Sequence, residues 1–333
     1  RGKANSAAFS PIVRGFIQCF YTGVVRIPAL LLALFLAAGC ANELVLDDDG
    51  AVAVIPHRVG SSGHIVVETM LNGRGPFTRA LDTAATISVV FDKDRAEAVL
   101  ELVPGETINV LGMTGYGRFP VARIAQFSVG GETWDAARVA VMPGDTRLAR
   151  EVDGILGIDF LSRYAIHYSQ QDKTLRLYPR EFVRERTYQG WNTIPLYDLK
   201  VGADHLSLYG FDIYIDAVRI PVLFDLGSSA NLMNRRAAKS LDIRPSLPRD
   251  RADVRGAFGK PVVVVELIAW RMQIAGVTWH RRSFLIGEFP IFDVLDLGKR
   301  PLAVAGTDMF RRHDFIIDFA GKRILVTSRS TLK

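Results

Sequence analysis

Two short segments of this sequence each set one aspartate between an apolar run and a stretch of small or hydroxyl-bearing residues. The first is Leu81-Asp82-Thr83-Ala84-Ala85-Thr86, and the second is Phe224-Asp225-Leu226-Gly227-Ser228-Ser229. Such a pattern predicts a strand, a tight loop that carries the Asp, and a second strand. A lone Asp in a tight loop is usually a turn former that hydrogen-bonds its own backbone. Two Asp side chains from matching loops can instead share one proton and act as an acid and a base.

The two Asp loops belong to a longer repeated pattern. An apolar-apolar-Gly run follows each loop and ends 75 positions after Asp82, at Gly157, and 81 positions after Asp225, at Gly306. An opening Ile-Pro pair, an Arg and two closing strand-like runs also occur in the same order in each half; the opening pairs are Ile55-Pro56 and Ile194-Pro195. Landmarks repeated in one order predict two copies of one β-rich unit, each offering one loop Asp.

An Asp-Thr-Gly loop with a later apolar-apolar-Gly run is the signature of aspartic proteases of the pepsin and retropepsin kind. On these residues the chain resembles a single-chain, two-lobed member of the bacterial retropepsin-like group over roughly residues 52–328. The resemblance implies an all-β fold of two homologous acid-protease lobes with few short helices. It also implies an aspartic endopeptidase whose catalytic pair is Asp82 and Asp225, with a peptide or protein substrate and no cofactor.

The expected organisation follows from the repeat and from the composition of its flanks. We expect a signal segment at 1–40, a tether at 41–51, a first lobe at 52–179, a linker at 180–192 and a second lobe at 193–328.

Both Asp loops depart from the family pattern, which has Thr and then Gly after each Asp. The first loop has Thr83 and then Ala84, and the second has Leu226 before Gly227 and Ser228. By the resemblance, the residues expected to support the catalytic loops are Thr83, Ala84, Gly227 and Ser228. If Ala84 had to adopt a positive φ, it would cost on the order of 1 kcal/mol. In the family, paired Thr hydroxyls brace the two loops, so Leu226 predicts that at least half of this brace is missing. The alternative to an active enzyme is a catalytically degenerate, membrane-tethered peptide-binding protein on the same fold. A structural envelope lipoprotein would leave the duplicated loops unexplained.

A Gly-rich stretch separates two strand-like runs within residues 108–119. Its glycines fit neither phosphate-binding fingerprint, so we expect a β-hairpin. In the family a hairpin flap at this place closes over the bound peptide, which makes Gly115 and Tyr116 the candidate substrate-binding residues. A surface hairpin with an incidental Tyr is the alternative. Residues 254–260 are the expected counterpart in the second half.

Periodicity predicts the remaining elements. Strands are expected at 64–71, 77–81, 206–215 and 218–224, a hairpin at 127–134, and short helices over 92–102 and within 230–241. Asp159 and Asp308 each follow the glycine of the apolar-apolar-Gly run, and we expect them at the N-termini of helices and not as catalysts.

The first 40 residues have the features of a targeting segment. Arg14 and Arg26 precede an apolar run that ends in Leu36-Ala37-Ala38-Gly39-Cys40. Small residues before a Cys resemble a lipobox, which makes Cys40 the candidate lipid-attachment residue and implies a membrane partner. We then expect the periplasmic side of the bacterial envelope, with the outer membrane favoured. A plain signal peptide, giving a soluble periplasmic or secreted protein, and an uncleaved anchor are the alternatives.

Composition excludes several other functions. Without residues 1–39 the chain has 37 basic and 35 acidic residues, so nothing points to nucleic acid. The two cysteines, Cys19 and Cys40, lie in the targeting region and leave no thiol nucleophile. None of the six histidines shows metal-ligand spacing, and each is expected to be structural or solvated. No Gly-x-Ser-x-Gly elbow occurs.

Overall fold

A computed structural model describes residues 50–92, 100–145, 148–185, 188, 190–201, 206–242, 251–254, 260–294 and 300–327. All of them lie in one compact unit, Leu46–Lys333. The predicted signal segment, most of the tether and Cys40 lie outside the described residues. Within the described ranges, no helix has the length and apolarity needed to cross a membrane.

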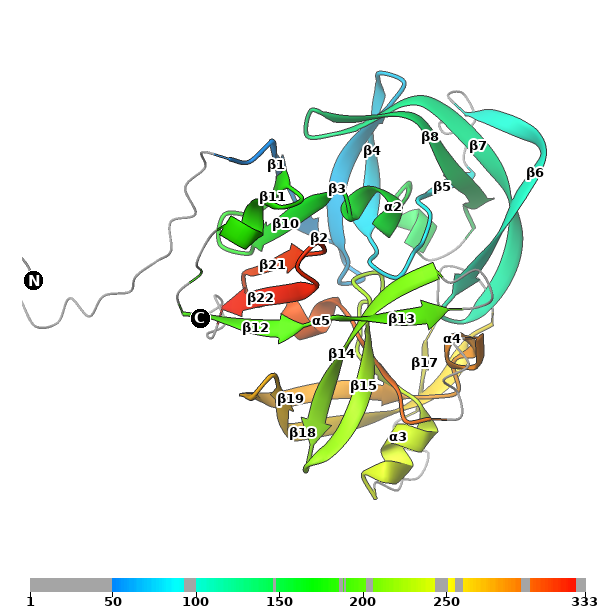
Figure 1. The fold of residues 1–333 in the computed structure, drawn as a ribbon. Coiled ribbons are helices and arrows are strands. Elements are labelled where there is room, and N and C mark those ends of the chain that lie inside the picture. The colour runs from blue at the N-terminus through cyan, green and yellow to red at the C-terminus, as the bar shows by residue number, and fades with distance from the viewer. Residues whose placement is uncertain are drawn as a thin grey trace, which may run out of the picture. The chain divides into compact units, whose positions relative to one another are not determined.

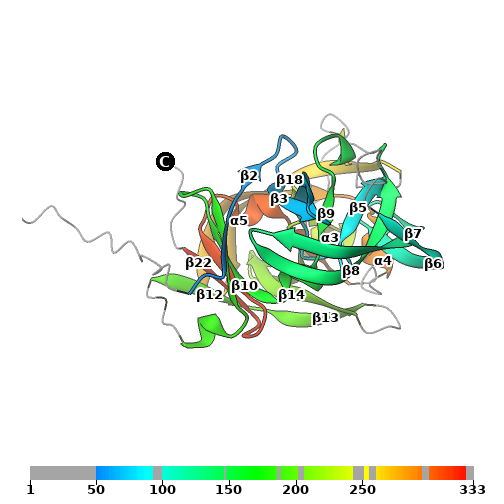
Figure 2. The same ribbon diagram turned by 90° about the horizontal axis from the view of Figure 1, so that it is seen from above.

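The first half of the chain forms an eight-stranded sheet with the order β2-β3-β4-β9-β5-β8-β7-β6 (Figures 1 and 2). A further pairing of β3 with β7 closes six of these strands into a barrel. The strands are β2 (Arg58–Val59), β3 (Ile65–Leu71), β4 (Arg74–Leu81), β5 (Val89–Asp92), β6 (Glu101–Gly112), β7 (Gly115–Val129), β8 (Glu132–Pro143) and β9 (Gly154–Leu156).

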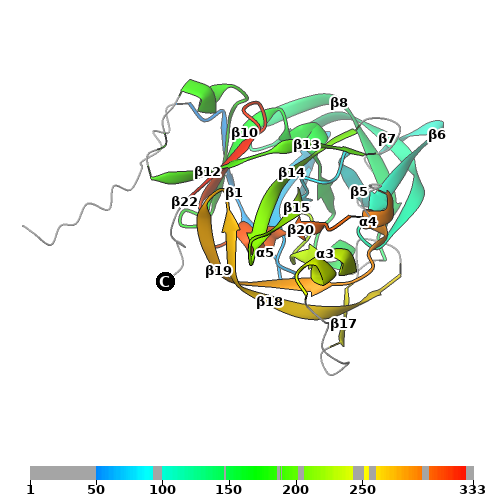
Figure 3. The ribbon, with the colours of Figure 1, turned by 60° about the horizontal axis from the view of Figure 1, so that its bottom comes forward.

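The second half repeats this arrangement strand for strand, with the order β13-β14-β15-β20-β16-β19-β18-β17 and closure by β14 and β18 (Figure 3). The strands are β13 (Tyr197–Val201), β14 (Leu206–Ile215), β15 (Val218–Phe224), β16 (Leu232–Met233), β17 (Arg251–Val254), β18 (Val262–Ile274), β19 (Val277–Ile286) and β20 (Ala303–Ala305). The predicted all-β fold with two homologous lobes is therefore confirmed.

A third sheet joins the two halves, with the order β1-β11-β10-β21-β22-β12 (Figure 1). The strands are β1 (Ala53–Pro56), β10 (Tyr164–Ser169), β11 (Thr174–Pro179), β12 (Trp191–Pro195), β21 (Phe315–Asp318) and β22 (Arg323–Thr327). Each half supplies three strands, and its Ile-Pro pair lies in an outer strand of this sheet. At the centre His167 pairs with Ile316, flanked by the pairs Ile166–Ile317 and Tyr168–Phe315.

The helices are short, and they lie at the ends of strands. They are η1 (Leu148–Arg150), α2 (Ile158–Leu161), η2 (Phe182–Glu185), α3 (Arg235–Ser240), α4 (Pro290–Val294) and α5 (Thr307–Phe310). The helix predicted within 230–241 is confirmed as α3, where the Asn234 side chain accepts a hydrogen bond from the Ala237 N–H and caps the first turn.

The helix predicted over 92–102 is wrong at both ends. Asp92 ends β5, and Glu101 and Leu102 begin β6, while residues 93–99 lie outside the described part of the chain. Pairing of β6 with the long strand β7 overrides the local helical spacing, because a ladder of hydrogen bonds outweighs a weak intrinsic preference.

Candidate active site

Each Asp loop begins where a strand of its barrel ends. Asp82 follows β4, and its N–H donates to the Leu156 carbonyl oxygen at 3.0 Å. Asp225 follows β15, and its N–H donates to the Ala305 carbonyl oxygen, also at 3.0 Å. The apolar-apolar-Gly strands β9 and β20 pair in parallel with β4 and β15. Each of these strands therefore fixes the first residue of the Asp loop beside it.

The glycines that end these strands let two backbones approach closely. A Cβ at Gly157 would lie 2.8 Å from the Ala85 carbonyl oxygen, and a Cβ at Gly306 would overlap the carbonyl oxygens of Ser228 and Ala230. Without side chains there, the next residues donate into the loops, Ile158 N–H to Ala85 at 2.8 Å and Thr307 N–H to Ser228 at 2.7 Å. The same two hydrogen bonds therefore hold each loop at both ends.

The side chains of Asp82 and Asp225 lie close enough together for each to shift the pKa of the other. Asp82 Oδ1 also accepts hydrogen bonds from the backbone N–H groups of Ala84 and Ala85, each at 2.8 Å, and Asp225 Oδ1 accepts one from Gly227 at 2.8 Å. Carboxylate oxygens can only accept, so two carboxyl groups can share a hydrogen bond only when one of them is protonated.

The two carboxyls titrate as a coupled pair. Burial raises the pKa of both, and the negative charge of Asp82 raises the pKa of Asp225 further, well above its ordinary range. The nearby His64 acts on Asp82 in the other direction and lowers its pKa. The pair therefore keeps one proton above the ordinary pKa range of an aspartate.

Thr83 is the brace between the loops. Its Oγ1 donates to the Phe224 carbonyl oxygen at 3.0 Å and accepts from the Leu226 N–H at 3.0 Å. The side chain of Leu226 is buried in the apolar core, so the opposite half of the brace is missing, as the sequence predicts. Thr307 holds the Leu226 carbonyl instead, because its hydroxyl donates to that oxygen at 2.8 Å. Ser228, a predicted support residue, donates its hydroxyl to the Ala230 carbonyl oxygen at 2.8 Å.

Ala84 does not carry the strain that a positive φ would have caused, because it is not among the residues with positive φ. The steric demand lies at the equivalent position of the second loop. A Cβ on Gly227 would overlap the Asp82 carboxyl, with Oδ1 only 2.6 Å away. Gly227 is thus required by the approach of the opposite Asp and not by its own backbone conformation.

Residues 67–160 match the sequence model of the family described as "Aspartyl protease". The match covers the Asp82 loop, the β6–β7 hairpin and the Gly157 strand, and it ends before the second barrel. No curated protein shows a significant match to the chain. The likeness of the second half to this matched segment therefore rests on its identical strand order and on its loop hydrogen bonds.

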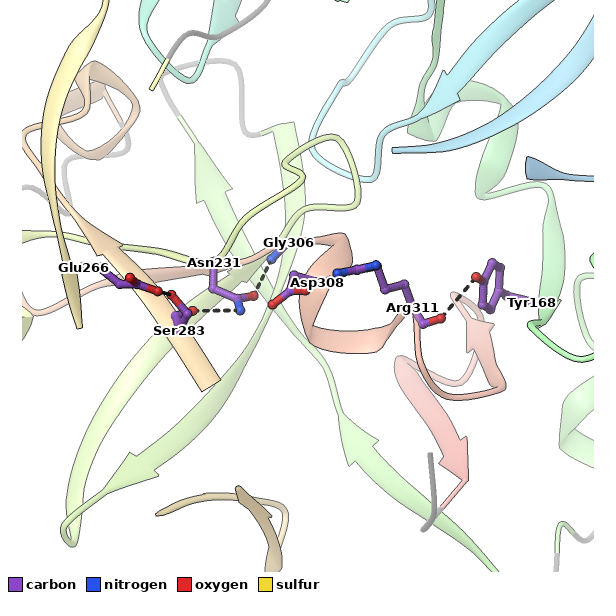
Figure 4. Close-up of polar contacts among 7 residues, drawn as sticks. All are labelled: Tyr168, Asn231, Glu266, Ser283, Gly306, Asp308 and Arg311. Atoms are coloured by element: carbon purple, nitrogen blue, oxygen red, sulfur yellow. Dashed lines mark hydrogen bonds and ion pairs between the residues drawn. The ribbon is translucent and has the colours of Figure 1, made fainter. Parts of the chain in front are cut away.

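A second layer of side chains supports each loop six residues after its Asp. In the first half, Ser88 Oγ accepts from the Gly157 N–H at 2.9 Å and donates to Asp159 Oδ1 at 2.8 Å. In the second half Asn231 takes this place: it accepts from the Gly306 N–H at 3.1 Å and donates to the Ser283 carbonyl at 3.1 Å (Figure 4).

Asp159 and Asp308 lie in the first turns of α2 and α5, as predicted, and their side chains accept hydrogen bonds from Ser88 and Arg311. Asp308 Oδ1 accepts a hydrogen bond at 2.9 Å from Arg311, the residue that follows α5 (Figure 4). The equivalent Asp159 accepts one from Ser88 instead. The residue that precedes each helix is a glycine without a side-chain cap, so the two Asp residues are not N-caps.

The predicted hairpin is formed by β6 and β7, whose Gly112 and Gly115 pair next to the turn. Leu111 and Met113 pack against an apolar cluster of the second half that also receives Ala84. The hairpin tip and the first Asp loop therefore pack against the same cluster. Tyr116 is 80% exposed, and its contact with substrate stays a prediction, as does that of Gly115. The tip of the counterpart hairpin between β17 and β18 lies outside the described residues.

His64 is a residue of the site that sequence reasoning missed. It is buried, and its Nε2 lies 2.9 Å from the Gly227 carbonyl oxygen, 163 positions along the chain. A single histidine before a strand gives no local signal of such a contact. Within the described residues, no group of three or more His, Cys, Asp or Glu side chains is placed to hold a metal ion.

Proposed function

We propose that the chain is an aspartic endopeptidase in which Asp82 and Asp225 together activate a water molecule for attack on a peptide bond. The mutual effect of the two buried carboxyls on each other's pKa carries this proposal, because two neighbouring carboxyls cannot both ionise easily and one of them keeps its proton. The aspartyl protease match of residues 67–160 supports a protease in general.

The asymmetry of the pair assigns a role to each carboxyl. Ionised Asp82 takes a proton from the water, and the oxygen of the water attacks the carbonyl carbon of the substrate. Protonated Asp225 gives its proton to the carbonyl oxygen, which forms a gem-diol. Asp82 then delivers its proton to the amide nitrogen while Asp225 takes one back from the gem-diol, and the C–N bond breaks. No covalent intermediate forms, and the pair ends in its starting protonation state.

The β6–β7 hairpin is in a position to cover a peptide held at this pair. Leu111 and Met113 from its tip share an apolar cluster with Ala84, which is two residues from Asp82. Apolar side chains at the hairpin and in this cluster favour apolar substrate side chains on either side of the scissile bond.

A peptide-binding protein without turnover is the second candidate. Two observations favour it: Leu226 leaves the loop brace half complete, and Ala84 brings a methyl group to the position that is glycine in the opposite loop. Both changes leave the Asp pair in place, so the two candidates differ in catalysis and not in the peptide they would hold.

Cleavage of a diverse peptide pool by the full-length protein from about pH 3 to 8 tests the proposal, since this range spans the titration of a coupled carboxyl pair. Asp82→Asn and Asp225→Asn should each abolish cleavage while the circular dichroism spectrum stays that of the wild type. A peptide with a secondary alcohol in place of the scissile amide should inhibit, because it resembles the gem-diol. A wild type that binds pool members without cutting them would select the second candidate.

We also propose that Cys40 anchors the protein to the periplasmic face of a bacterial membrane, with the outer membrane favoured. The lipobox-like run before Cys40 is the support for this proposal. Metabolic labelling with a fatty acid should mark the wild type and not Cys40→Ala. Labelling of both proteins, or of neither, would discard the anchor.

A further inference from the structure

A line of hydrogen bonds runs from Glu151 to the second Asp loop. The backbone N–H of Ser62 lies 3.2 and 3.4 Å from the two Glu151 carboxylate oxygens, and its hydroxyl also contacts that carboxylate. The same hydroxyl lies 2.7 Å from His64 Nδ1, and His64 Nε2 lies 2.9 Å from the Gly227 carbonyl oxygen. The line therefore starts on the first half of the chain and ends two residues after Asp225.

We propose that His64 is a positioning residue of the Asp pair: it holds the second loop through Gly227, and its protonated form favours the ionised form of Asp82. This inference rests on the proposed function, because it assigns a role in the same site. His64 does not touch the reacting atoms; it acts through the loop and through its charge.

Counting protons along the line gives His64 two states. The Gly227 carbonyl can only accept, so Nε2 carries a hydrogen in both states. The Ser62 hydroxyl has one hydrogen. When it donates to ionised Glu151, it must accept from Nδ1–H, and His64 is an imidazolium. When His64 is neutral, the hydroxyl turns to donate to Nδ1 and releases Glu151. One proton and one hydroxyl rotation separate the two states.

The charged groups around this line come from several elements. Asp82 follows β4 and lies beside Asp225, which follows β15. Glu151 follows η1. Arg58 of β2 lies 3.5 Å from the Glu151 carbonyl oxygen. Burial lowers the pKa of His64, and the Gly227 carbonyl and the charges of Asp82 and Glu151 oppose that change only in part. The imidazolium of His64 therefore forms only as the pH falls, over the same acidic range in which Asp82 would take up a proton. Its charge delays that protonation and keeps the pair singly ionised to a lower pH.

The second half of the chain offers a matched control for this role. Val66 pairs with Ala80, two residues before Asp82, and Gly210 pairs with Leu223, two residues before Asp225. The position equivalent to His64 is therefore Leu208, which is buried in the apolar cluster against which Ala84 packs. A leucine fills this place without a polar group, so the barrel does not need a histidine there for its fold.

Histidine-detected NMR on the full-length protein labelled with ¹⁵N-histidine tests the charge coupling without any substrate. His64 is assigned by its loss in His64→Gln. We expect Nε2 to stay protonated and Nδ1 to lose its proton as the pH rises. Asp82→Asn and Glu151→Gln should each shift that transition to lower pH. An unchanged His64 transition in both variants would overturn the inference.

The pH profile of peptide cleavage tests the effect on the Asp pair. His64→Gln keeps an N–H for Gly227 but carries no charge, so the acid limb of kcat/KM should move up by about one pH unit. His64→Leu should move it equally and also lower kcat, because the second loop loses its anchor. His280→Gln, which changes an exposed histidine of β19, is the control and should leave the profile unchanged.

The two experiments separate this inference from the proposed function. A protein that cleaves peptides with the same acid limb in the wild type and His64→Gln overturns the role of His64 alone. A protein that cleaves no peptide but whose His64 responds to Asp82→Asn overturns the protease and leaves the coupling supported.

Discussion

The loops that carry Asp82 and Asp225 have the same backbone hydrogen bonds but face different side chains. Gly227 and His64 meet at the Asp225 loop, where the glycine leaves room for the opposite carboxyl and its carbonyl meets the histidine. At the Asp82 loop the equivalent positions are Ala84 and Leu208, which belong to one apolar cluster. Two copies of one unit thus share a scaffold, and the side chains that differ between them give the two Asp residues different surroundings.

The largest effect should come from adding a methyl group to the loop that lacks one. Gly227→Ala places a Cβ against the Asp82 carboxyl and must displace it. A misplacement of about 1 Å in a catalytic group costs on the order of 100-fold in rate, so we expect at least that loss of kcat/KM. Ala84→Gly is the matched variant in the other loop and should change kcat/KM by less than about 5-fold, because the 0.4–1 kcal/mol that such an exchange typically costs acts mainly through the unfolded chain. Equal losses in the two variants would contradict the difference between the loops.

Removing the loop brace should cost stability next. Thr83→Val leaves the Phe224 carbonyl and the Leu226 N–H without this partner, at about 1–3 kcal/mol for each buried group. We expect a loss of about 2–4 kcal/mol in the free energy of unfolding measured with urea. Thr83→Ser keeps the hydroxyl and should lose about 1 kcal/mol. Leu226→Thr should also destabilise, since it puts a hydroxyl into the apolar core; a gain would show that the missing half of the brace can be restored.

The pH dependence of stability should distinguish the two carboxyls. The pKa of Asp225 is raised in the folded protein, so its favourable contribution is complete below its ordinary value of 3.8 and is lost as the pH rises through the folded value. Asp225→Asn removes this loss, and its urea midpoint should fall less between pH 4 and 7 than that of the wild type. Asp82→Asn should flatten the curve less. If Asp82→Asn flattened the pH dependence of the urea midpoint more than Asp225→Asn did, the retained proton would belong to Asp82 and not to Asp225.

The smallest effects should come from the second layer. Ser88→Ala and Asn231→Ala each remove two side-chain hydrogen bonds that support an apolar-apolar-Gly strand. At about 0.5–1.5 kcal/mol for each bond, we expect losses of about 1–3 kcal/mol in both. Thermal unfolding monitored by circular dichroism checks this, and a silent Asn231→Ala would mean that the second half relies on other contacts.

The repeat made the fold predictable from the sequence. Landmarks in one order, with nearly equal spacing, predict equal strand order in the two halves. The loop positions of Asp82 and Asp225 followed from the same repeat, and so did the incomplete brace at Leu226, because a missing hydroxyl is visible in the sequence.

Other features depended on contacts that a local pattern does not contain. The helical spacing of 92–102 was overridden at its two ends by the β5–β8 and β6–β7 ladders. The requirement for Gly227 comes from a carboxyl 145 positions earlier in the chain, and not from its own φ. The role of His64 depends on a carbonyl from the other half, so no spacing rule could have indicated it.

The central pair of the joining sheet has a consequence for the history of the chain. Counted from Gly157 and Gly306, His167 and Ile316 occupy the same position of their repeats. Ile166 pairs with the residue equivalent to Tyr168, and Tyr168 pairs with the residue equivalent to Ile166. The pairing is therefore self-complementary, and a half-chain that ends after β11 would form the same sheet with a second copy of itself. Such a homodimer would bring two copies of His167 face to face. Burial lowers the pKa of His167 in this chain to about 3, so the imidazole is neutral at the centre of the sheet. With Ile316 opposite it, the fused chain buries one such imidazole at this pair and the homodimer would bury two.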